Sequence, residues 1–383
     1  MLPVIDLDAF LTGDDAIKQT QGELTAQALI RYGALIVKDS RVSEQANEHF
    51  LDVLEDYFDQ EEYLLEQDLR PQWGWQTGVT LESTEKPKCH SSDACKAVIA
   101  SLEPEERPIA SEAGQADPKC RFFYRMGVAP PETDFKSLSM ENVIPERFTE
   151  TWQQDMEAWG NQMKTSVETV AQALAVGLGL NELTLLQAAE YGSHLLAPTS
   201  TDLRKYGREG EIFAGFHTDL NALTIHGRSR YPGLHIWARN TGKKIAVKVP
   251  PGHLLVQAGM QLEHLTAGLI KAGYHEVVCT RQTLEAIERR QADLKTKDRP
   301  SIRISSTFFW HFSSDYVLRP QAFVASIQGS RVVREEQERI MKDLESSKGA
   351  QRPAMAVPKD EYEEDFKVGE LVQRELRHIA LMT

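Results

Sequence analysis

The feature that most constrains the fold is a change in pattern near residue 200, after which short β-prone segments follow one another with turn signals between them. Few helical patterns interrupt this series, which disfavours a doubly wound parallel sheet and predicts a sandwich or barrel. One interruption, about 281–298, is highly charged and is predicted to be a solvated helical insertion between two strands. The expected strands are 202–206, 215–225, 233–238, 244–249, 253–257, 275–279 and 301–312.

Helical patterns dominate the chain on either side of this region. Apolar residues recur at steps of three and four from Trp152 to Leu178, which predicts a long scaffold helix over about 146–178. The stretch from about 82 to 118 is rich in Ser, Glu, Lys and Pro and is predicted to form long loops. Shorter helices are expected over about 20–32, 43–60, 331–347 and 367–381. These elements together predict an α+β protein with a mainly β core.

Three regions of the chain are expected from these patterns. They are an N-terminal α/β region with long loops (1–145), the scaffold helix with the β core (146–330), and a helical tail (331–383). Since no internal repeat and no free linker separates them, we expect one compact unit.

The composition excludes several classes of function. With 43 Lys and Arg against 57 Asp and Glu, the net charge of −14 argues against non-specific nucleic-acid binding. No signal peptide and no membrane span is expected. The four cysteines form no C-x-x-C pair, which predicts reduced thiols in a cytoplasmic protein, and the run from Cys89 to Cys95 fits no zinc spacing and is expected to be loop. The composition leaves the oligomeric state open.

A metal site is indicated by His217 and Asp219, which stand two apart in the apolar run 215–225. If that run is a strand, both side chains point to the same face. Two His and one carboxylate hold Fe(II) and leave positions open for other ligands. Either His264 or His275 can supply the third ligand; His275 is favoured because it opens a β-prone run, and a ligand belongs on a rigid element.

A carboxylate-binding pair is indicated by Arg303 and Ser305, which share a face if 301–312 is a strand. A guanidinium binds a carboxylate through two parallel hydrogen bonds, and a neighbouring hydroxyl can donate a third. A dicarboxylic cosubstrate that chelates the metal at one end needs such a pair at the other. The alternative is that Arg303 faces solvent.

These motifs, in this order, resemble the isopenicillin-N-synthase-like branch of the iron(II)/2-oxoglutarate-dependent oxygenases. The resemblance covers most of the chain and includes 2–7, 32–37, 217–219, 233–236, 251–259, 261–268, 271–275 and 303–309. It identifies His275, 56 residues after Asp219, as the second metal histidine. The family often has Asp and Arg at the positions of Met260 and Glu276, and these departures concern the subfamily and the substrate.

The resemblance implies a double-stranded β-helix, or jelly roll, flanked by N-terminal and C-terminal helices. It implies that His217, Asp219 and His275 hold Fe(II), and that 2-oxoglutarate lies on Arg303 and Ser305. Tyr206 matches a strand tyrosine that faces the cosubstrate, although a buried structural role is an equal alternative. With O₂, the implied reaction couples oxidative decarboxylation of 2-oxoglutarate to hydroxylation, desaturation or ring formation on a small organic substrate.

Substrate residues are less sharply indicated. Arg121 and Arg125 share a face of an expected strand and either bind a substrate carboxylate or lie solvated at an edge. Asn221 faces inward by alternation from Asp219, and Phe309 either lines the pocket or packs in the core. The last helix either closes over the mouth of the barrel or only packs against it.

Two other functions remain open at this point. An iron oxidase of the same fold that does not use 2-oxoglutarate carries the same Arg-x-Ser pair. A jelly roll retained as a non-enzymatic binding module is the second alternative, against which the intact ligand set argues.

Overall fold

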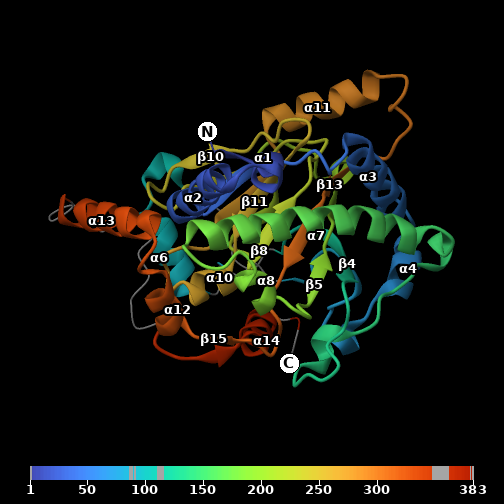
Figure 1. The fold of residues 1–383 in the computed structure, drawn as a ribbon. Helices are drawn as coiled ribbons and strands as arrows, with labels where there is room; N and C mark the ends of the chain where they lie inside the picture. The colour runs from blue at the N-terminus through green and yellow to red at the C-terminus, as the bar shows by residue number, and fades with distance from the viewer. Residues whose placement is uncertain are drawn as a thin grey trace.

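A computed structural model describes residues 2–85, 89, 92–109, 116–346, 362–379 and 381. Its described residues form a ten-stranded sheet, a four-stranded sheet and a small two-stranded sheet (Figure 1). The order along the large sheet is β1-β2-β11-β8-β14-β5-β4-β6-β13, with β3 paired to β4, and the order along the smaller sheet is β10-β9-β12-β7. The predicted α+β class with a mainly β core is confirmed.

The strands have the following bounds. Those of the large sheet are β1 (Val4–Asp6), β2 (Ala34–Lys38), β3 (Gly78–Thr80), β4 (Cys120–Met126), β5 (His194–Leu196), β6 (Thr199–Asp202), β8 (Leu223–His226), β11 (His253–Ala258), β13 (Ile302–Ser305) and β14 (Thr307–Trp310). Those of the smaller sheets are β7 (Ile212–His217), β9 (Leu234–Trp237), β10 (Lys244–Ala246), β12 (Tyr274–Val278), β15 (Val317–Leu318) and β16 (Phe366–Lys367).

The helices frame these sheets. The α-helices are α1 (Leu7–Thr12), α2 (Asp15–Tyr32), α3 (Glu44–Phe58), α4 (Glu62–Leu65), α6 (Asp93–Ser101), α7 (Trp152–Gly177), α8 (Thr184–Ala188), α9 (Leu203–Tyr206), α10 (Met260–Leu265), α11 (Arg281–Ala292), α12 (Pro320–Ile327), α13 (Arg331–Ser346) and α14 (Val368–His378). Short 3₁₀ turns lie at Glu66–Asp68, Pro71–Trp73, Pro104–Glu106, Lys136–Ser139 and Glu146–Phe148. Among the described residues, none of these helices combines the length and the apolarity needed to cross a bilayer.

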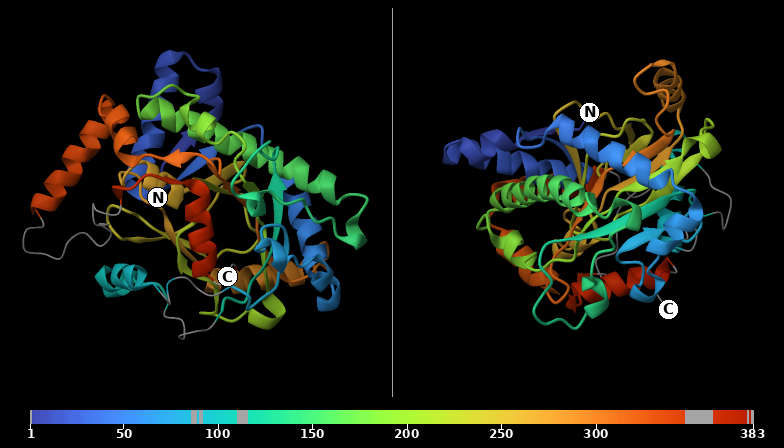
Figure 2. Two further views of the ribbon diagram at one scale, coloured as in Figure 1. Left: turned by 90° about the horizontal axis from the view of Figure 1, so that it is seen from below. Right: turned by 90° about the vertical axis from the view of Figure 1, so that its right-hand side faces the viewer.

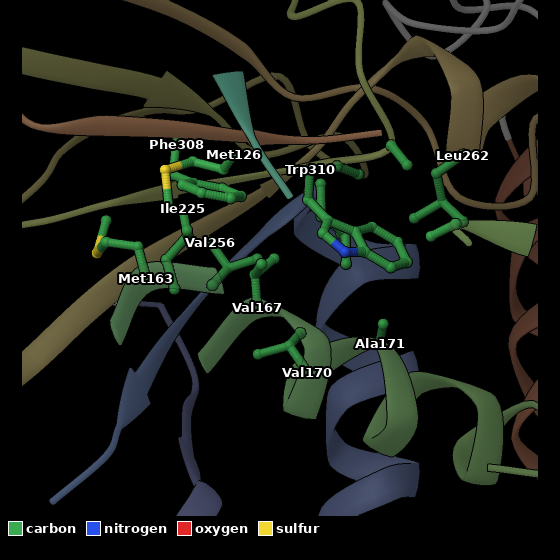
Figure 3. Packing of buried hydrophobic residues seen from close by; sticks show 14 of the residues in the cluster. Met126, Met163, Val167, Val170, Ala171, Ile225, Val256, Leu262, Phe308 and Trp310 are labelled. Atoms are coloured by element: carbon green, nitrogen blue, oxygen red, sulfur yellow. The ribbon is translucent and has the colours of Figure 1, made fainter. Parts of the chain in front are cut away.

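The scaffold helix α7 packs beside α2 and turns its apolar face to the large sheet (Figures 1 and 3). Met163, Val167 and Val170 on α7 lie within the same buried cluster as Ile225 of β8 and Phe308 of β14. The predicted apolar face is therefore confirmed. The helix begins at Trp152 rather than near 146, because a 3₁₀ turn follows Pro145 and does not continue as α-helix.

The charged insertion is helical, as predicted, and α11 projects away from the sheets (Figures 1 and 2). Its base is tied to α3 through Glu55, whose side chain is 1% exposed. The Glu55 carboxylate meets Arg230 at 2.8 Å and Arg290 and Arg299 at 3.3 Å each. Three guanidiniums from separate parts of the chain therefore converge on one buried anion.

Glu55→Ala is expected to destabilise the protein by about 3–5 kcal/mol, because it removes the one buried carboxylate that these three guanidiniums share. Urea unfolding at neutral pH measures this. The neighbouring Asp56→Ala is the control: Asp56 is 51% exposed and pairs with Arg299 at 2.7 Å, so its loss should cost less than about 1 kcal/mol. Equal effects of the two substitutions would contradict this account.

The structure corrects several predictions of secondary structure. The expected strand 202–206 is instead the end of β6 followed by α9, whose first turn is capped by the Asp202 carboxylate. The run 215–225 divides into β7 and β8 around a loop at 218–222, and 301–312 divides into β13 and β14. The helix α12 was not predicted.

The region 82–118 also differs from the long loops predicted for it. It contains α6, whose first turn is capped by Ser92. A disulfide joins Cys89 to Cys95, so the expectation of four reduced cysteines is wrong for this pair. Cys120 and Cys279 are free. His90 and Ser91, between the bridged cysteines, lie outside the described residues.

Candidate metal centre and its cavity

Three potential metal ligands from the predicted set meet in the structure. His217 ends β7, His275 is the second residue of β12, and the two strands pair antiparallel with these residues directly opposite. Asp219 follows in the loop after β7. The Asp219 Oδ1 lies 3.8 Å from His217 Nε2 and 3.8 Å from His275 Nε2. Among the described residues, these three form the one such cluster, with ligand atoms within 4.8 Å of one another.

Backbone carbonyls orient both imidazoles. The Nδ1 of His217 lies 2.6 Å from the Gly215 carbonyl oxygen, and the Nδ1 of His275 lies 3.3 Å from that of Gly273. A proton on each Nδ1 leaves each Nε2 with a free lone pair toward Asp219. Metal-binding histidines commonly donate their second ring nitrogen in this way.

Asp219 is positioned by its own loop rather than by strand alternation. The Thr224 hydroxyl donates to Asp219 Oδ2 at 2.6 Å and lies 3.1 Å from the amide oxygen of Asn221. The Asp219 carbonyl accepts from Met260 N at 2.9 Å, which ties the loop to α10. The alternation argument for His217, Asp219 and Asn221 is therefore wrong, because β7 ends at His217, although all three side chains reach the site.

The charge states of the cluster suit a cation. Burial lowers the pKa of His217 to about 4, and His275 and Lys119 contribute to this shift. Burial alone would raise the pKa of Asp219, but the two imidazoles and Thr224 hold it below its usual value. At neutral pH, His217 offers a neutral imidazole and Asp219 a carboxylate, which is the ligand chemistry of a non-haem Fe(II) site. The residues present therefore fit a divalent metal ion.

Arg303 and Ser305 lie on one strand, β13, as predicted. Arg303 is 5% exposed, its Nε is buried without a hydrogen-bond partner, and no carboxylate among the described residues forms an ion pair with it. Burial lowers the pKa of this guanidinium to about 10. Because a buried, unpaired cation is costly, this arrangement suits an anion that binds beside it.

A cavity of about 610 Å³ opens onto the metal cluster. Ser305 and Thr307 line it, as do His226 and the predicted substrate residues Arg121, Asn221 and Phe309. Arg303 is not among the lining residues, but Ser305 on the same strand is; burial lowers the pKa of His226, and the nearby charge of Arg303 adds to this shift. Ser305 of the predicted Arg-x-Ser pair and the metal cluster therefore line one cavity.

The C-terminal helix contributes to the same cavity. Val372, Glu375, Leu376 and Ile379 line it from α14 or its end. This agrees with the alternative in which the last helix lies over the mouth. Lys119, Glu85 and Asp117 also line the cavity and were not predicted, because they lie in an irregular, charged stretch without a recognisable pattern.

Two predicted residues lie elsewhere. The Arg125 guanidinium donates to the carbonyl oxygens of Met140 and Gly127 at 3.0 Å each and holds a loop, so it is not on the cavity wall. Tyr206 ends the helix α9 and packs near Leu203 and Phe213 in a separate apolar cluster, also off the cavity wall. The structural alternative for Tyr206 fits this position, because the expected strand is a helix there.

The departures from the family pattern have local explanations. Glu276, beside His275, is 1% exposed and pairs with Lys244 at 2.5 Å, which replaces the usual Arg by an internal ion pair. Met260 begins α10 and lines the cavity. His264 packs against the rings of Tyr362 and Phe366, outside the metal cluster.

Two buried histidines near the cavity predict an acid-sensitive fold. Burial lowers the pKa values of His226 and His311 to about 3, so both stay neutral in the folded protein. In the unfolded chain they protonate below about 6.5. Their contribution to stability is therefore complete above about pH 6.5 and is lost as the pH falls toward 3, by up to about 1.4 kcal/mol per pH unit for each.

Urea unfolding with a metal chelator at pH 7.5, 6.5 and 5.5 measures this loss. His311→Asn should flatten the slope between pH 6.5 and 5.5. Equal unfolding free energies at pH 7.5 and 5.5 in the unsubstituted protein would contradict the prediction.

The fold and site together define a jelly-roll protein with a candidate His-Asp-His metal centre. Comparison with known proteins agrees. The model of the 2OG-Fe(II) oxygenase superfamily matches residues 185–312, and this part of the chain is a domain of that superfamily. That match spans β5 through β14 and contains all three candidate ligands.

Curated relatives are distant. A gibberellin 20-oxidase-like protein from Arabidopsis thaliana is 22% identical over 226 residues, which is 56% of this chain and 65% of the relative. A flavonol synthase/flavanone 3-hydroxylase from Petunia hybrida is 28% identical over 121 residues, which is 31% of this chain and 34% of the relative. The chain thus matches less than two thirds of the length of either.

Solved structures show the same fold over nearly the whole chain. A putative 2OG-Fe(II) oxygenase family protein from Caulobacter crescentus has a TM-score of 0.66 at 19% identity, covering 99% of this chain and 99% of that one. A Neurospora crassa protein in complex with alpha-KG has a TM-score of 0.67 at 17% identity, covering 98% and 96%. A dioxygenase for auxin oxidation from rice has a TM-score of 0.56 at 14% identity, covering 98% and 95%. At such identities the likeness establishes the fold.

Proposed function

We propose that the protein is a non-haem Fe(II)- and 2-oxoglutarate-dependent oxygenase that oxidises a small organic substrate. One observation carries this proposal: the His-Asp-His cluster and Ser305 line one cavity, and Arg303, buried without a carboxylate partner among the described residues, lies two residues before Ser305 on the same strand. The superfamily supports it. Fe(II) with 2-oxoglutarate and O₂ would supply the oxidising chemistry, and the protein would supply binding, orientation and exclusion of water.

In this proposal, His217, Asp219 and His275 hold the metal through Nε2, a carboxylate oxygen and Nε2. The Gly215 and Gly273 carbonyls keep the two imidazoles in the required tautomer, and Thr224 fixes the carboxylate. Such preorganisation places three ligand atoms at one edge of the cavity before the metal arrives.

Arg303 and Ser305 bind the distal carboxylate of 2-oxoglutarate. The guanidinium supplies the counter-charge and the hydroxyl a further hydrogen bond. This ion pair also removes the cost of an unpaired buried cation, so the cosubstrate stabilises the folded protein. Tyr206 is not assigned a role in binding.

The oxidised substrate is proposed to occupy the rest of the cavity, against Phe309 and the α14 side chains. Similar folds hold small molecules of this kind: one structure of the Neurospora crassa protein contains thymine and a JOX2 structure contains JA. Hydroxylation, desaturation and ring formation are all compatible with a cavity of this size. A cytoplasmic location is retained as a proposal from composition, and the Cys89–Cys95 disulfide is unusual for a reducing compartment.

The test is release of succinate in the presence of Fe(II), 2-oxoglutarate, O₂ and a library of small organic compounds. We expect succinate in proportion to oxidised product. Oxygen consumption that depends on a library compound but not on 2-oxoglutarate would instead identify an iron oxidase that does not use this cosubstrate.

A further inference from the structure

The cavity wall contains a buried arginine, Arg121, whose surroundings differ from those of Arg303. Arg121 on β4 is 8% exposed and lines the cavity. Its Nη1 forms an ion pair with the Glu85 carboxylate, its Nε lies 3.4 Å from the Thr80 hydroxyl, and its guanidinium carbon lies 4.0 Å from the centre of the Phe123 ring. Its Nη2 is buried and has no hydrogen-bond partner.

The charge of Arg121 is already compensated. Glu85 pairs with Arg121 and also with Lys119, at 3.3 Å, and Lys119 pairs with Asp117 at 3.0 Å. Asp117 in turn accepts from Gly215 N at 3.1 Å, two residues before His217. Two carboxylates and two cations therefore form a closed network on the wall beside the metal cluster.

The site beside Arg121 and the site beside Arg303 suit ligands of different charge. Arg303 has no carboxylate partner among the described residues and suits an anion, whereas a second anion beside Arg121 would also lie beside Glu85. Like charges in a site of low dielectric constant repel strongly. One donor of Arg121, Nη2, has no partner among the described residues, and a neutral oxygen acceptor that reaches it satisfies the donor without adding charge.

Two other cations line the wall, and their donors are turned to backbone carbonyls or lie in an exposed side chain. The Arg107 guanidinium donates to the carbonyl oxygens of Leu102 and Ala100 at 3.1 and 3.2 Å, and the Lys96 side chain is 56% exposed. Apolar side chains make up much of the remaining wall, including Phe123 and Phe309, whose rings meet edge to face at 6.0 Å.

We propose that the substrate is uncharged at this end, with a carbonyl-type acceptor on Arg121 Nη2 and an apolar body against Phe123 and Phe309. Glu85 is then the specificity-determining residue, because it cancels the charge of Arg121 and so excludes carboxylates. That the bound molecule is a substrate rests on the proposed function. The predicted preference for uncharged ligands can be measured without turnover.

The test uses matched pairs of probes that differ only in charge: 2-naphthamide and 2-naphthoate, indole-3-carboxamide and indole-3-carboxylate, and cinnamamide and cinnamate. Binding to the anaerobic protein loaded with Fe(II) and saturating 2-oxoglutarate is measured by ligand-observed NMR, so that Arg303 is not available to the carboxylates. We expect the amide of at least one pair to bind, and to bind at least about tenfold more tightly than its carboxylate, since tenfold is about 1.4 kcal/mol.

Glu85→Gln should reduce or reverse this preference by about tenfold, because it exposes the charge of Arg121. Glu82→Gln removes the same charge from a side chain that is 33% exposed and off the cavity wall, and should leave the preference unchanged. Glu85→Gln should therefore bind carboxylates more tightly than the unsubstituted protein does, and this gain should disappear in the double variant Glu85→Gln/Arg121→Gln. Melting temperatures report whether each variant is folded.

Three results would overturn the inference. They are tighter binding of the carboxylates to the unsubstituted protein, no binding of any amide at millimolar concentration, and an unchanged preference in a folded Glu85→Gln variant. If the unsubstituted protein prefers amides but releases no succinate from 2-oxoglutarate, the result would count against the proposed function alone. If Glu85→Gln does not fold, the preference of the unsubstituted protein still decides.

Discussion

His217→Ala is expected to abolish iron retention and turnover while leaving the metal-free protein folded. The substitution removes one of three ligand atoms, and the two that remain, on Asp219 and His275, lie 3.8 Å apart. Changes in the groups that only support such ligands cost about 10–100-fold in metal affinity, so loss of a ligand itself should cost at least about 100-fold. The fold should persist, because burial already holds this imidazole in its neutral form.

The measurement is bound iron per chain after gel filtration, with melting in the presence of a chelator as the test of folding. His253→Ala is the matched control: His253 lies on β11 and is not among the residues that line the cavity, and its Nδ1 lies 2.9 Å from the Pro251 carbonyl oxygen. Stoichiometric iron in folded His217→Ala would show that the metal binds at another site.

Arg303→Gln is expected to weaken 2-oxoglutarate binding by about 100-fold, or ~3 kcal/mol, because it removes the buried counter-charge for the distal carboxylate. The same substitution should not destabilise the ligand-free protein, and should stabilise it, because Arg303 is buried without an anionic partner. A loss of 2-oxoglutarate affinity together with a gain in ligand-free stability distinguishes a binding residue from a structural one.

Isothermal titration with the metal-loaded, anaerobic protein measures the affinity, and urea unfolding without ligand measures the stability. Arg281→Gln, on the insertion helix α11 with a side chain 78% exposed, is the matched control for loss of charge. An unchanged affinity for 2-oxoglutarate, or a large loss of ligand-free stability, would refute the assigned role of Arg303.

The candidate metal ligands could be proposed from the sequence more readily than the local structure that holds them. His217 and His275 could be found because their order and spacing are specific, and the structure brings them together by pairing β7 with β12. Strand alternation does not explain the position of Asp219. The carboxylate reaches the cluster from a loop held by Thr224 and Met260, and no alternation pattern describes such a loop.

The substrate side could not be predicted from spacing alone. Arg121 and Arg125 look equivalent on a strand, and the structure separates them because Arg125 meets backbone carbonyls whereas Arg121 meets Glu85. Glu85 lies in an irregular stretch 36 residues before Arg121, so only the folded chain shows the pair. Long-range ion pairs of this kind leave no periodic signal in a sequence.

In the proposed function, one cavity holds Fe(II) on His217, Asp219 and His275 and 2-oxoglutarate beside Arg303. Anaerobic titration of the metal-free protein with Fe(II), and then with 2-oxoglutarate, tests this without knowledge of the substrate. The account predicts a visible charge-transfer band that saturates near one equivalent of each, is absent from His217→Ala, and requires more 2-oxoglutarate in Arg303→Gln. No band in the folded, unsubstituted protein would contradict it and would favour a jelly roll that binds without catalysis.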